Sequence, residues 1–319
     1  MKKKNMVLAF CILALAIISI FFCMHRFSGT KMITMKLSWE REAGDHLRIH
    51  QLHKIPPYKR TRGISLVVHG LNLKPEKMQS IVSGLNNARI EVLNLSLRGH
   101  GQNHTTGRDL STDEARLDSF RHVSYALWLH EVYEAYLAVR ERATKKRVPV
   151  FLIGYSLGGL MLCDLVLSFP DINYDRMVLF APALHLSADS YLLKVFMPFP
   201  NMVIDSLSPM AYRANEGTPI AAYSALFEAV DYFEKHVDSR LNKPTIIFID
   251  KNDEFISSPK LSDMILQHHL DQWHVQTVQK VQGIDKKISN HLIIDEASIG
   301  EKEWKDVKKI MIRHLLDRY

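Results

Sequence analysis

Cysteine is scarce in this chain, with three residues in 319. Cys11 and Cys23 both fall in an apolar run near the N-terminus, which leaves Cys163 as the single thiol of the body. One thiol can form neither a disulfide framework nor a cysteine-based metal site. A hydrophobic core must therefore stabilise the chain, and its 47% of hydrophobic residues is enough for a large one.

Signals of nucleic-acid binding are also missing. The formal net charge is +7, but three of the positive charges are Lys2, Lys3 and Lys4 at the extreme N-terminus. The remaining excess is scattered, and the sequence has no zinc-finger spacing, no RNP-like segment and no dense basic helix. Internal repeats and low-complexity stretches are absent as well. We therefore expect no nucleic-acid partner.

Residues 1–30 contain a long apolar run, from Met6 to Met24, which only Ser19 interrupts. About 19 apolar residues are close to the length that spans a hydrocarbon core. A cleaved signal peptide has a shorter apolar stretch and small residues before the cut, whereas bulky residues such as Phe22 end this run. We expect an uncleaved membrane anchor, with export after signal cleavage as the alternative. The lysines that precede the run should stay cytoplasmic, which puts the body on the non-cytoplasmic side of the membrane.

The body, residues 31–319, alternates between short β-branched runs and amphipathic stretches. Strands are predicted at 33–40, 45–54, 63–68, 90–97, 148–153, 177–180, 245–249 and 274–281. Helices are predicted at 75–86, 117–146, 156–169 and 301–316. The first two strands are expected to form an edge hairpin. Alternation of this kind is typical of a mostly parallel sheet flanked by helices, so the predicted fold class is α/β.

The alternation breaks between residues 184 and 241, a segment with several prolines and irregularly spaced aromatics. It lies between two predicted strands and is interpreted as a cap inserted into the α/β domain. Apolar side chains are unusually dense there for a surface segment: Leu192, Leu193, Val195, Phe196, Met197, Phe199, Met202 and Val203. They indicate either a mobile cap that shapes an apolar acyl pocket or a segment that folds back onto the core.

The strongest local motif is Gly154-Tyr155-Ser156-Leu157-Gly158-Gly159, because a predicted buried strand precedes it and a predicted helix follows. That context is typical of a nucleophile elbow, a turn so tight that side chains at 154 and 158 would clash. The turn exposes the Ser156 hydroxyl at its tip, which predicts Ser156 as a nucleophile. The Leu157 amide begins the helix, where unpaired N–H groups and the helix dipole favour negative charge, which predicts an oxyanion donor.

Serine is a weak nucleophile unless a base removes its proton, and in this arrangement an acid and then a histidine follow along the chain. The acid should come just after a late strand. Asp253 is favoured because it lies in the polar loop there, clear of the strand end, with Asp250 and Glu254 as alternatives. The histidine should precede the last helix. His291 is favoured because it is the only histidine between the last predicted strand and that helix.

The second oxyanion donor should come from the loop that follows the 63–68 strand. His69, Gly70 and Leu71 occupy that loop, and the backbone amide of Leu71 is the candidate donor. The alternative role for His69 is that of a polar residue that closes the strand. These motifs imply no metal ion and no organic cofactor.

Together the motifs resemble the monoglyceride-lipase-like and serine-aminopeptidase-like branch of the α/β-hydrolase superfamily. The resemblance spans about residues 63–294 with gaps across the cap, and these residues carry it: His69-Gly70, Arg98-Gly99-His100-Gly101, Trp128, the motif at 154–159, Asp253 with Ile256, and His291. It implies the α/β-hydrolase fold and hydrolysis of an ester or an amide. Asp250 departs from the family's usual glycine, Asn103 replaces its serine, and an N-terminal anchor is not typical of it.

We expect a serine hydrolase that cleaves a carboxylic ester, with a small-molecule or lipid ester such as a monoacylglycerol as substrate. His291 would take the proton of Ser156, while Asp253 orients the imidazole. The amides of Leu71 and Leu157 would bind the oxyanion. A peptidase or thioesterase with the same triad is the alternative among enzymes. A catalytically inactive, membrane-tethered binding protein is the alternative from another class.

Overall fold

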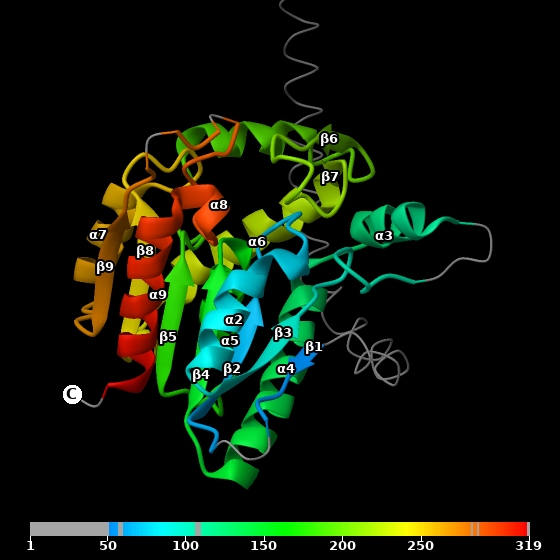
Figure 1. Ribbon diagram of the computed structural model, residues 1–319. Helices are drawn as coiled ribbons and strands as arrows, with labels where there is room; N and C mark the ends of the chain where they lie inside the picture. The colour runs from blue at the N-terminus through cyan, green and yellow to red at the C-terminus, as the bar shows by residue number, and fades with distance from the viewer. Residues whose placement is uncertain (1–50, 57–59, 106–109, 282, 286, 318–319) are drawn as a thin grey trace, which may run out of the picture. The chain divides into compact units, whose positions relative to one another are not determined.

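The computed structural model describes residues 51–56, 60–105, 110–281, 283–285 and 287–317. They form a seven-stranded sheet in the spatial order β1-β3-β2-β4-β5-β8-β9, with helices on both faces (Figure 1). The strands are β1 (Gln51–His53), β2 (Gly63–Val68), β3 (Ile90–Leu95), β4 (Val150–Tyr155), β5 (Arg176–Phe180), β8 (Thr245–Asp250) and β9 (Trp273–Val278). All neighbours are parallel except β1, which pairs antiparallel with β3. This topology confirms the predicted fold class.

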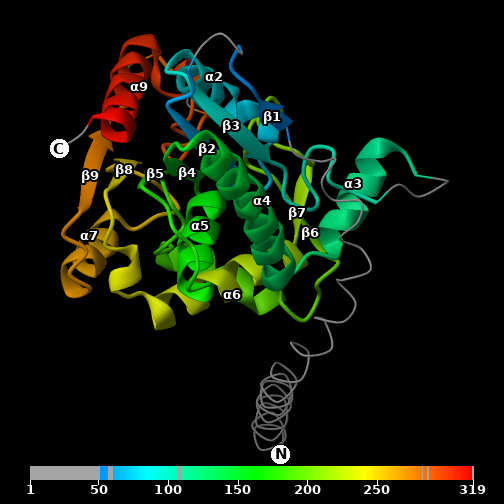
Figure 2. The ribbon, with the colours of Figure 1, turned by 90° about the horizontal axis from the view of Figure 1, so that it is seen from below.

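In chain order, the helices are η2 (Pro75–Met78), α2 (Gln79–Asn87), α3 (Thr112–Arg121), α4 (Tyr125–Lys146), α5 (Leu157–Ser168), η3 (Ala188–Phe196), α6 (Ile220–His236), η4 (Ser239–Leu241), α7 (Ser258–Gln267), α8 (Glu296–Ile299) and α9 (Glu301–Leu316). Seen from below, α2 and α9 cover one face of the sheet, while α4, α5 and α6 lie on the other (Figure 2). The sheet therefore separates two hydrophobic cores.

The period of the strands explains the two cores. Successive side chains of a strand point to opposite faces of its sheet. In β2, Ile64, Leu66 and Val68 pack in the core under α4 and α5, whereas Val67 packs in the core under α2 and α9. Every residue of β2 is buried, as expected for a strand covered on both faces.

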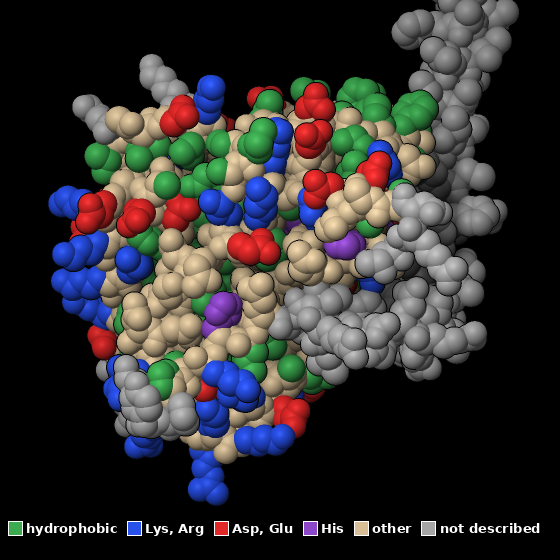
Figure 3. Space-filling view, turned by 45° about the vertical axis from the view of Figure 1, so that its right-hand side comes forward, with side chains coloured by type: hydrophobic (Ala, Val, Ile, Leu, Met, Phe, Trp, Pro, Cys, Tyr) green, Lys and Arg blue, Asp and Glu red, His purple; other side chains and the backbone are tan. Residues whose placement is uncertain are grey.

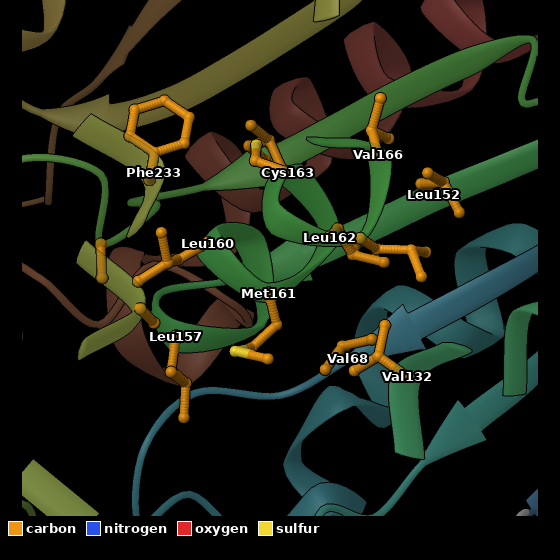
Figure 4. Close-up of a cluster of buried hydrophobic side chains, with 14 of the residues drawn as sticks. Val68, Val132, Leu152, Leu157, Leu160, Met161, Leu162, Cys163, Val166 and Phe233 are labelled. Carbon is orange, nitrogen blue, oxygen red and sulfur yellow. The ribbon is translucent and has the colours of Figure 1, made fainter. Parts of the chain in front are cut away.

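Helix α5 lies at the centre of the first core. All of its residues from Leu157 to Leu167 are buried, because the sheet covers one side while α4 and α6 cover the others. Figure 4 shows Leu157, Leu160 and Met161 on this helix, with Phe233 of α6 nearby. The start of α5 is therefore held from all sides, which fixes the turn that precedes it.

The single helix predicted over 117–146 is wrong, because the structure has two helices, α3 and α4. Ser111 and Glu114 form a capping box that starts α3. Ser124 is extended and accepts a hydrogen bond from the Leu127 amide, which starts α4. Caps of this kind satisfy amides that a continuous helix would pair internally, so the three-residue break is stable.

The predicted insertion, residues 184–241, contains η3, a two-stranded sheet, α6 and η4. The small sheet consists of β6 (Val203–Asp205) and β7 (Gly217–Pro219), which are antiparallel. Helix α6 packs against α5 with its apolar face and belongs to the first core. Helix η3 has no fully buried residue. The segment is thus a core helix preceded by an exposed portion, and its action as a mobile cap stays a prediction.

The predicted strand at 33–40 and the apolar run from Met6 to Met24 lie outside the described residues. Of the predicted strand at 45–54, the structure describes β1 at the sheet edge. In the part of the chain that the structure describes, no helix is both long enough and apolar enough to cross a membrane.

Candidate active site

Ser156 occupies the sharp turn between β4 and α5. Its backbone has φ 51° and ψ −118°, a conformation that residues other than glycine rarely adopt. Two of its backbone hydrogen bonds join it to β5 and the residues after that strand. The Ser156 amide donates to Phe180 O at 2.9 Å, and the Ala183 amide donates to Ser156 O at 3.1 Å. The strain is therefore borne by the neighbouring β5 strand and the residues after it.

The glycines of the motif are there for the steric reason that the sequence suggested. A Cβ atom at Gly154 would lie 2.5 Å from the Gly159 nitrogen. A Cβ atom at Gly158 would lie 2.2 Å from the Val68 carbonyl oxygen. Both contacts are with backbone, which cannot move aside without breaking the sheet or the helix. The elbow thus needs Gly154 where β4 meets α5, and Gly158 where α5 meets the end of β2.

A chain of two hydrogen bonds joins Ser156, His291 and Asp253. His291 Nε2 lies 2.8 Å from Ser156 Oγ, and His291 Nδ1 lies 2.8 Å from Asp253 Oδ2. The Asp253 side chain is fully buried, and its other oxygen accepts hydrogen bonds from the amides of Phe255 and Ile256. The structure brings together the three residues that the sequence singled out, across 135 positions between the serine and the histidine.

The two alternative acids have other partners. Asp250 ends β8, and its Oδ1 accepts the Asn252 amide at 2.8 Å, so it shapes the turn. Glu254 accepts the amides of Asn290 and His291 at 2.9 and 3.1 Å. Neither carboxylate meets the His291 ring. Asp250 stands where the family usually has glycine. It does not replace Asp253 as the hydrogen-bond partner of the histidine.

The segment that carries His291 is held from several directions. The Tyr155 ring lies 5.3 Å from the imidazole and the Phe255 ring meets it edge-on at 5.3 Å, measured between ring centroids. Lys280 Nζ donates to the carbonyls of Ile288 and Ser289. Burial lowers the pKa of Lys280, and nearby carboxylates including Glu254 oppose that shift. The contacts of Lys280 and Glu254 were not expected from the sequence.

The predicted oxyanion loop lies directly beside the nucleophile. A Cβ atom at Gly70 would lie 2.8 Å from the Tyr155 ring and 3.1 Å from Ser156 Cβ. Residues 70–73 form a turn closed by a hydrogen bond from the Leu73 amide to Gly70 O at 3.2 Å. Leu157, the other predicted donor, is the first residue of α5, where amides have no acceptor within the helix. Gly70, the residue before Leu71, thus lies against Ser156, and Leu157 follows Ser156 in the sequence.

Two buried histidines brace this loop against the Arg98-Gly99-His100-Gly101 loop. His69 Nε2 accepts the Leu97 amide at 3.1 Å, and His100 Nε2 accepts the Asn72 amide at 2.9 Å. Each Nε2 is an acceptor, so both rings are neutral with the proton on Nδ1. Burial lowers the pKa of His69 to about 4 and that of His100 well below its usual range. His69 thus does more than close the strand.

Glu131 and Trp128 of α4 support the same loop from below. Glu131 accepts the Arg98 amide at 2.8 Å and the Asn103 side-chain amide at 2.9 Å, and Trp128 Nε1 donates to Arg98 O at 3.1 Å. Burial raises the pKa of Glu131 to about 7, against the lowering effect of these donors. Asn103, which replaces the family's serine, is buried and also donates to Ser96 O. Asn103 therefore takes part in the hydrogen bonds that hold the loop.

Metal coordination has no candidate within the described residues, where no three His, Cys, Asp or Glu side chains are grouped to hold an ion. The polar groups around Ser156 are a hydroxyl, an imidazole, a carboxylate and backbone amides. Such a set can transfer protons and stabilise negative charge on oxygen.

The sequence matches the protein family described as serine aminopeptidase, S33, over residues 59–316. The chain belongs to this family. Its members are hydrolases with the α/β-hydrolase fold, in agreement with the elbow and the sheet described above. The branch that the motifs predicted is thereby confirmed. Among curated proteins, the comparison finds no match.

Solved structures with the same fold include several lipases and esterases. A soluble variant of monoglyceride lipase from Saccharomyces cerevisiae, in complex with a substrate analog, has a TM-score of 0.65 at 15% identity, with 84% of this chain and 90% of that chain covered. Monoacylglycerol lipase from Paleococcus ferrophilus has a TM-score of 0.58 at 17% identity, with 83% and 98% covered. Est1E from Butyrivibrio proteoclasticus with bound ferulic acid has a TM-score of 0.53 at 17% identity, with 84% and 95% covered. At these identities the likeness concerns the fold.

Proposed function

We propose that this protein is a serine esterase that cleaves carboxylic esters with an apolar acyl group, with Ser156 as nucleophile, His291 as base and Asp253 as its orienting acid. The observation that carries the proposal is the continuous hydrogen-bond chain from Ser156 Oγ through both nitrogens of His291 to the buried Asp253. A hydroxyl held by an imidazole, itself held by a buried carboxylate, is the arrangement that activates a serine.

The proposed reaction has two acyl transfers. Ser156 Oγ attacks the ester carbonyl carbon while its proton passes to His291 Nε2, and the carbonyl oxygen becomes an oxyanion near the amides of Leu71 and Leu157. Collapse of this intermediate breaks the bond to the alcohol, which leaves with the proton from His291. Water then attacks the acyl-serine with the same base, and the carboxylic acid departs. Asp253 stabilises the imidazolium in both transfers.

An apolar substrate is supported by the exposed part of the insertion. Leu192 is 68% exposed, Phe199 is 62% exposed and Leu207 is 88% exposed. Hydrophobic side chains appear along the upper edge of the face in Figure 3. Leu193 and Met197, by contrast, pack partly against the first core. The predicted apolar cluster thus divides into a part that folds back and a part that faces outward, where it is available to an acyl chain or a lipid surface.

The monoglyceride and monoacylglycerol lipases among the structural neighbours agree with such a substrate, although they share only the fold with this chain. Hydrolysis of an amide is the second candidate, because the family that matches is described as a serine aminopeptidase. Thioesters would use the same groups. A catalytically inactive binding protein is the remaining alternative.

A fluorophosphonate probe tests the nucleophile. We expect the purified protein to be labelled, and Ser156→Ala to abolish labelling while the far-ultraviolet circular dichroism stays unchanged. Persistent labelling of a folded Ser156→Ala variant would exclude Ser156. Absence of labelling in the parent protein would favour the inactive binding protein.

A substrate series tests the ester class and the role of the insertion. Each methylene transferred from water contributes about 0.8 kcal/mol, so kcat/KM should rise along a series of monoacylglycerols and simple esters of increasing acyl length. Phe196→Asp and Phe199→Asp should reduce activity on long acyl chains more than on acetyl esters. Equal losses on all esters would argue against an acyl-binding insertion, and faster turnover of aminoacyl amides or thioesters would reassign the substrate.

We also propose that the run from Met6 to Met24 anchors the protein in a membrane, with the body on the non-cytoplasmic side. Its length and its bulky C-terminal end support this. Membrane fractionation with intact-mass measurement tests it. A soluble product that begins near residue 25 would instead show a cleaved signal.

A further inference from the structure

Asn72 follows the predicted oxyanion donor Leu71 directly and has an unusual backbone. Its φ is 51°, in the left-handed region that few residues other than glycine and asparagine enter. It occupies the third position of the turn at residues 70–73, where a positive φ is typical of type II turns. The side chain is 5% exposed. The backbone at Asn72 therefore determines how the Leu71–Asn72 peptide is turned.

The Asn72 side chain pairs with the backbone of Asn215, a residue 143 positions away in the insertion. Its Nδ2 donates to Asn215 O at 3.1 Å, and its Oδ1 accepts the Asn215 amide at 2.8 Å. A side-chain amide that both donates to and accepts from one residue copies the pairing of a β-ladder. The pairing continues along the chain, because Ala214 N donates to Asn72 O and Lys74 N donates to Tyr212 O, both at 2.8 Å.

The backbone amide of Asn72 is also engaged, since it donates to His100 Nε2 at 2.9 Å. All four polar groups of this residue thus have partners. Asn215 in turn reaches the second loop, because its Nδ2 donates to Gly99 O at 2.9 Å and its Oδ1 accepts from Arg116 Nε at 3.2 Å. The insertion is therefore joined to both loops beside Ser156 through one buried pair of asparagines.

We propose that Asn72 is a positioning residue that sets the oxyanion loop from the insertion, through its side-chain pairing with Asn215. Within the described residues, the Leu71 amide has no hydrogen-bond acceptor, whereas the amides of Asn72 and Leu73 have one each. Leu71 is thus the amide of this turn left for an incoming oxygen. The proposal rests on the proposed esterase function, because it concerns the oxyanion site of that reaction.

Substitution with glycine separates the side-chain link from the backbone conformation. Asn72→Gly keeps the positive φ accessible and removes both side-chain hydrogen bonds. Asn72→Asp keeps the acceptor for the Asn215 amide and loses the donor. Arg89→Gly is the matched control, because Arg89 also has a positive φ, at 66°, and is exposed at the opposite end of the strands. It reports the general effect of a new glycine in this conformation.

We expect kcat of the full chain on its best ester to fall at least about tenfold in Asn72→Gly relative to Arg89→Gly, with KM changed less than about twofold. Complete loss of an oxyanion donor lowers kcat about 10²–10³-fold in other hydrolases, so a donor that is only displaced should lower kcat by a smaller factor. A trifluoromethyl ketone, which forms a tetrahedral oxyanion on the serine, should lose affinity in proportion to kcat/KM. Asn72→Asp should have a kcat and an inhibitor affinity between those of the parent protein and Asn72→Gly. The pH profile of kcat should keep its shape, because the Ser156–His291–Asp253 contacts are left in place.

An Asn72→Gly protein with the kcat of Arg89→Gly would overturn the proposal. So would a loss that appears in KM alone, or inhibitor affinity that stays at the parent value while kcat falls. If Asn72→Gly does not fold, the same criteria apply to Asn72→Asp. Failure of the esterase function itself looks different, because the parent protein would then show neither ester turnover nor labelling at Ser156.

Discussion

Asp250, the last residue of β8, and Asp253 are three residues apart and yet contact different groups. Asp253 meets the His291 imidazole, while Asp250 accepts the Asn252 amide and is 3% exposed. The turn itself explains the difference, because the Asp253 amide donates to Asp250 O at 3.1 Å and folds the chain back by three residues. The Asp253 carboxylate is thereby placed in contact with His291.

Asparagine substitutions should separate the two acids. Asp253→Asn is expected to lower kcat by about 10⁴-fold, because a neutral amide can hold the imidazole in the wrong tautomer and cannot stabilise its cation. Asp250→Asn keeps the Oδ1 acceptor for Asn252 and should change kcat by less than about threefold. Steady-state kinetics on one ester measures both. If Asp250→Asn proves the more damaging change, the acid has been misassigned.

At the scale of elements, His291 lies in the loop from β9 to α8, whose described residues form no helix or strand. It is held at its backbone instead. Glu254 accepts two consecutive amides, at Asn290 and His291, and Lys280 donates to the two carbonyls that precede them. The Glu254 carboxylate and the Lys280 ammonium thus bind neighbouring peptide groups of the loop. Glu254 therefore contacts the backbone of the His291 segment, although it does not contact the imidazole.

Removal of the Glu254 carboxylate should loosen His291. We expect Glu254→Ala to lower kcat about tenfold with little change in KM, since a small displacement of a base slows proton transfer. Glu254→Gln keeps one acceptor and should fall between the parent and Glu254→Ala. Lys251→Ala, at an exposed residue of the same turn, serves as the control. Indistinguishable kcat values for Glu254→Ala and Lys251→Ala would show that the carboxylate has no positioning role.

At the scale of the whole molecule, the first core contains a carboxylic acid in its interior. Asp164 of α5 is fully buried, and neither of its oxygens has a hydrogen-bond partner of ordinary geometry among the described residues. Burial raises the pKa of Asp164 well above its usual range, and the Tyr125 hydroxyl offsets this only in part. The folded protein therefore keeps the Asp164 proton to a higher pH than the unfolded chain does.

This difference makes stability depend on pH. The unfolded acid ionises near pH 3.9, so the contribution of Asp164 is fully present below about that pH and is lost as the pH rises toward the raised pKa of the folded state. Asp164→Asn cannot ionise and should be more stable than the parent at pH 8, with a smaller advantage at pH 5. Urea unfolding at both pH values measures this. An advantage that does not grow with pH would show that Asp164 stays ionised in the folded protein.

Local chemistry made several features of this protein readable from its sequence. The elbow at Ser156 has a recognisable glycine spacing, because a Cβ atom at Gly154 would clash with the backbone of α5 and one at Gly158 with the end of β2. The parallel sheet follows from alternating apolar periods, and the position of His291 follows from the order of the last elements. Membership of the hydrolase family agrees with these motifs. The roles of Ser156, His291 and Asp253 in catalysis stay predictions that the variants above test.

Other features depend on contacts between distant segments, which no local pattern encodes. The break between α3 and α4 was missed because the cap at Ser124 looks like an ordinary polar residue in a long amphipathic stretch. Which of the three acids contacts His291 depends on how the turn after β8 folds. The Asn72–Asn215 pair forms only because the fold brings together two residues that are 143 positions apart. The sequence by itself determined the strands of the sheet, the elbow and the candidate nucleophile, since the apolar periods and the glycine spacing that predict them are local patterns. Only the tertiary structure decided which buried polar groups meet, because an asparagine or a glutamate pairs with whatever the packing of distant elements brings within about 3 Å.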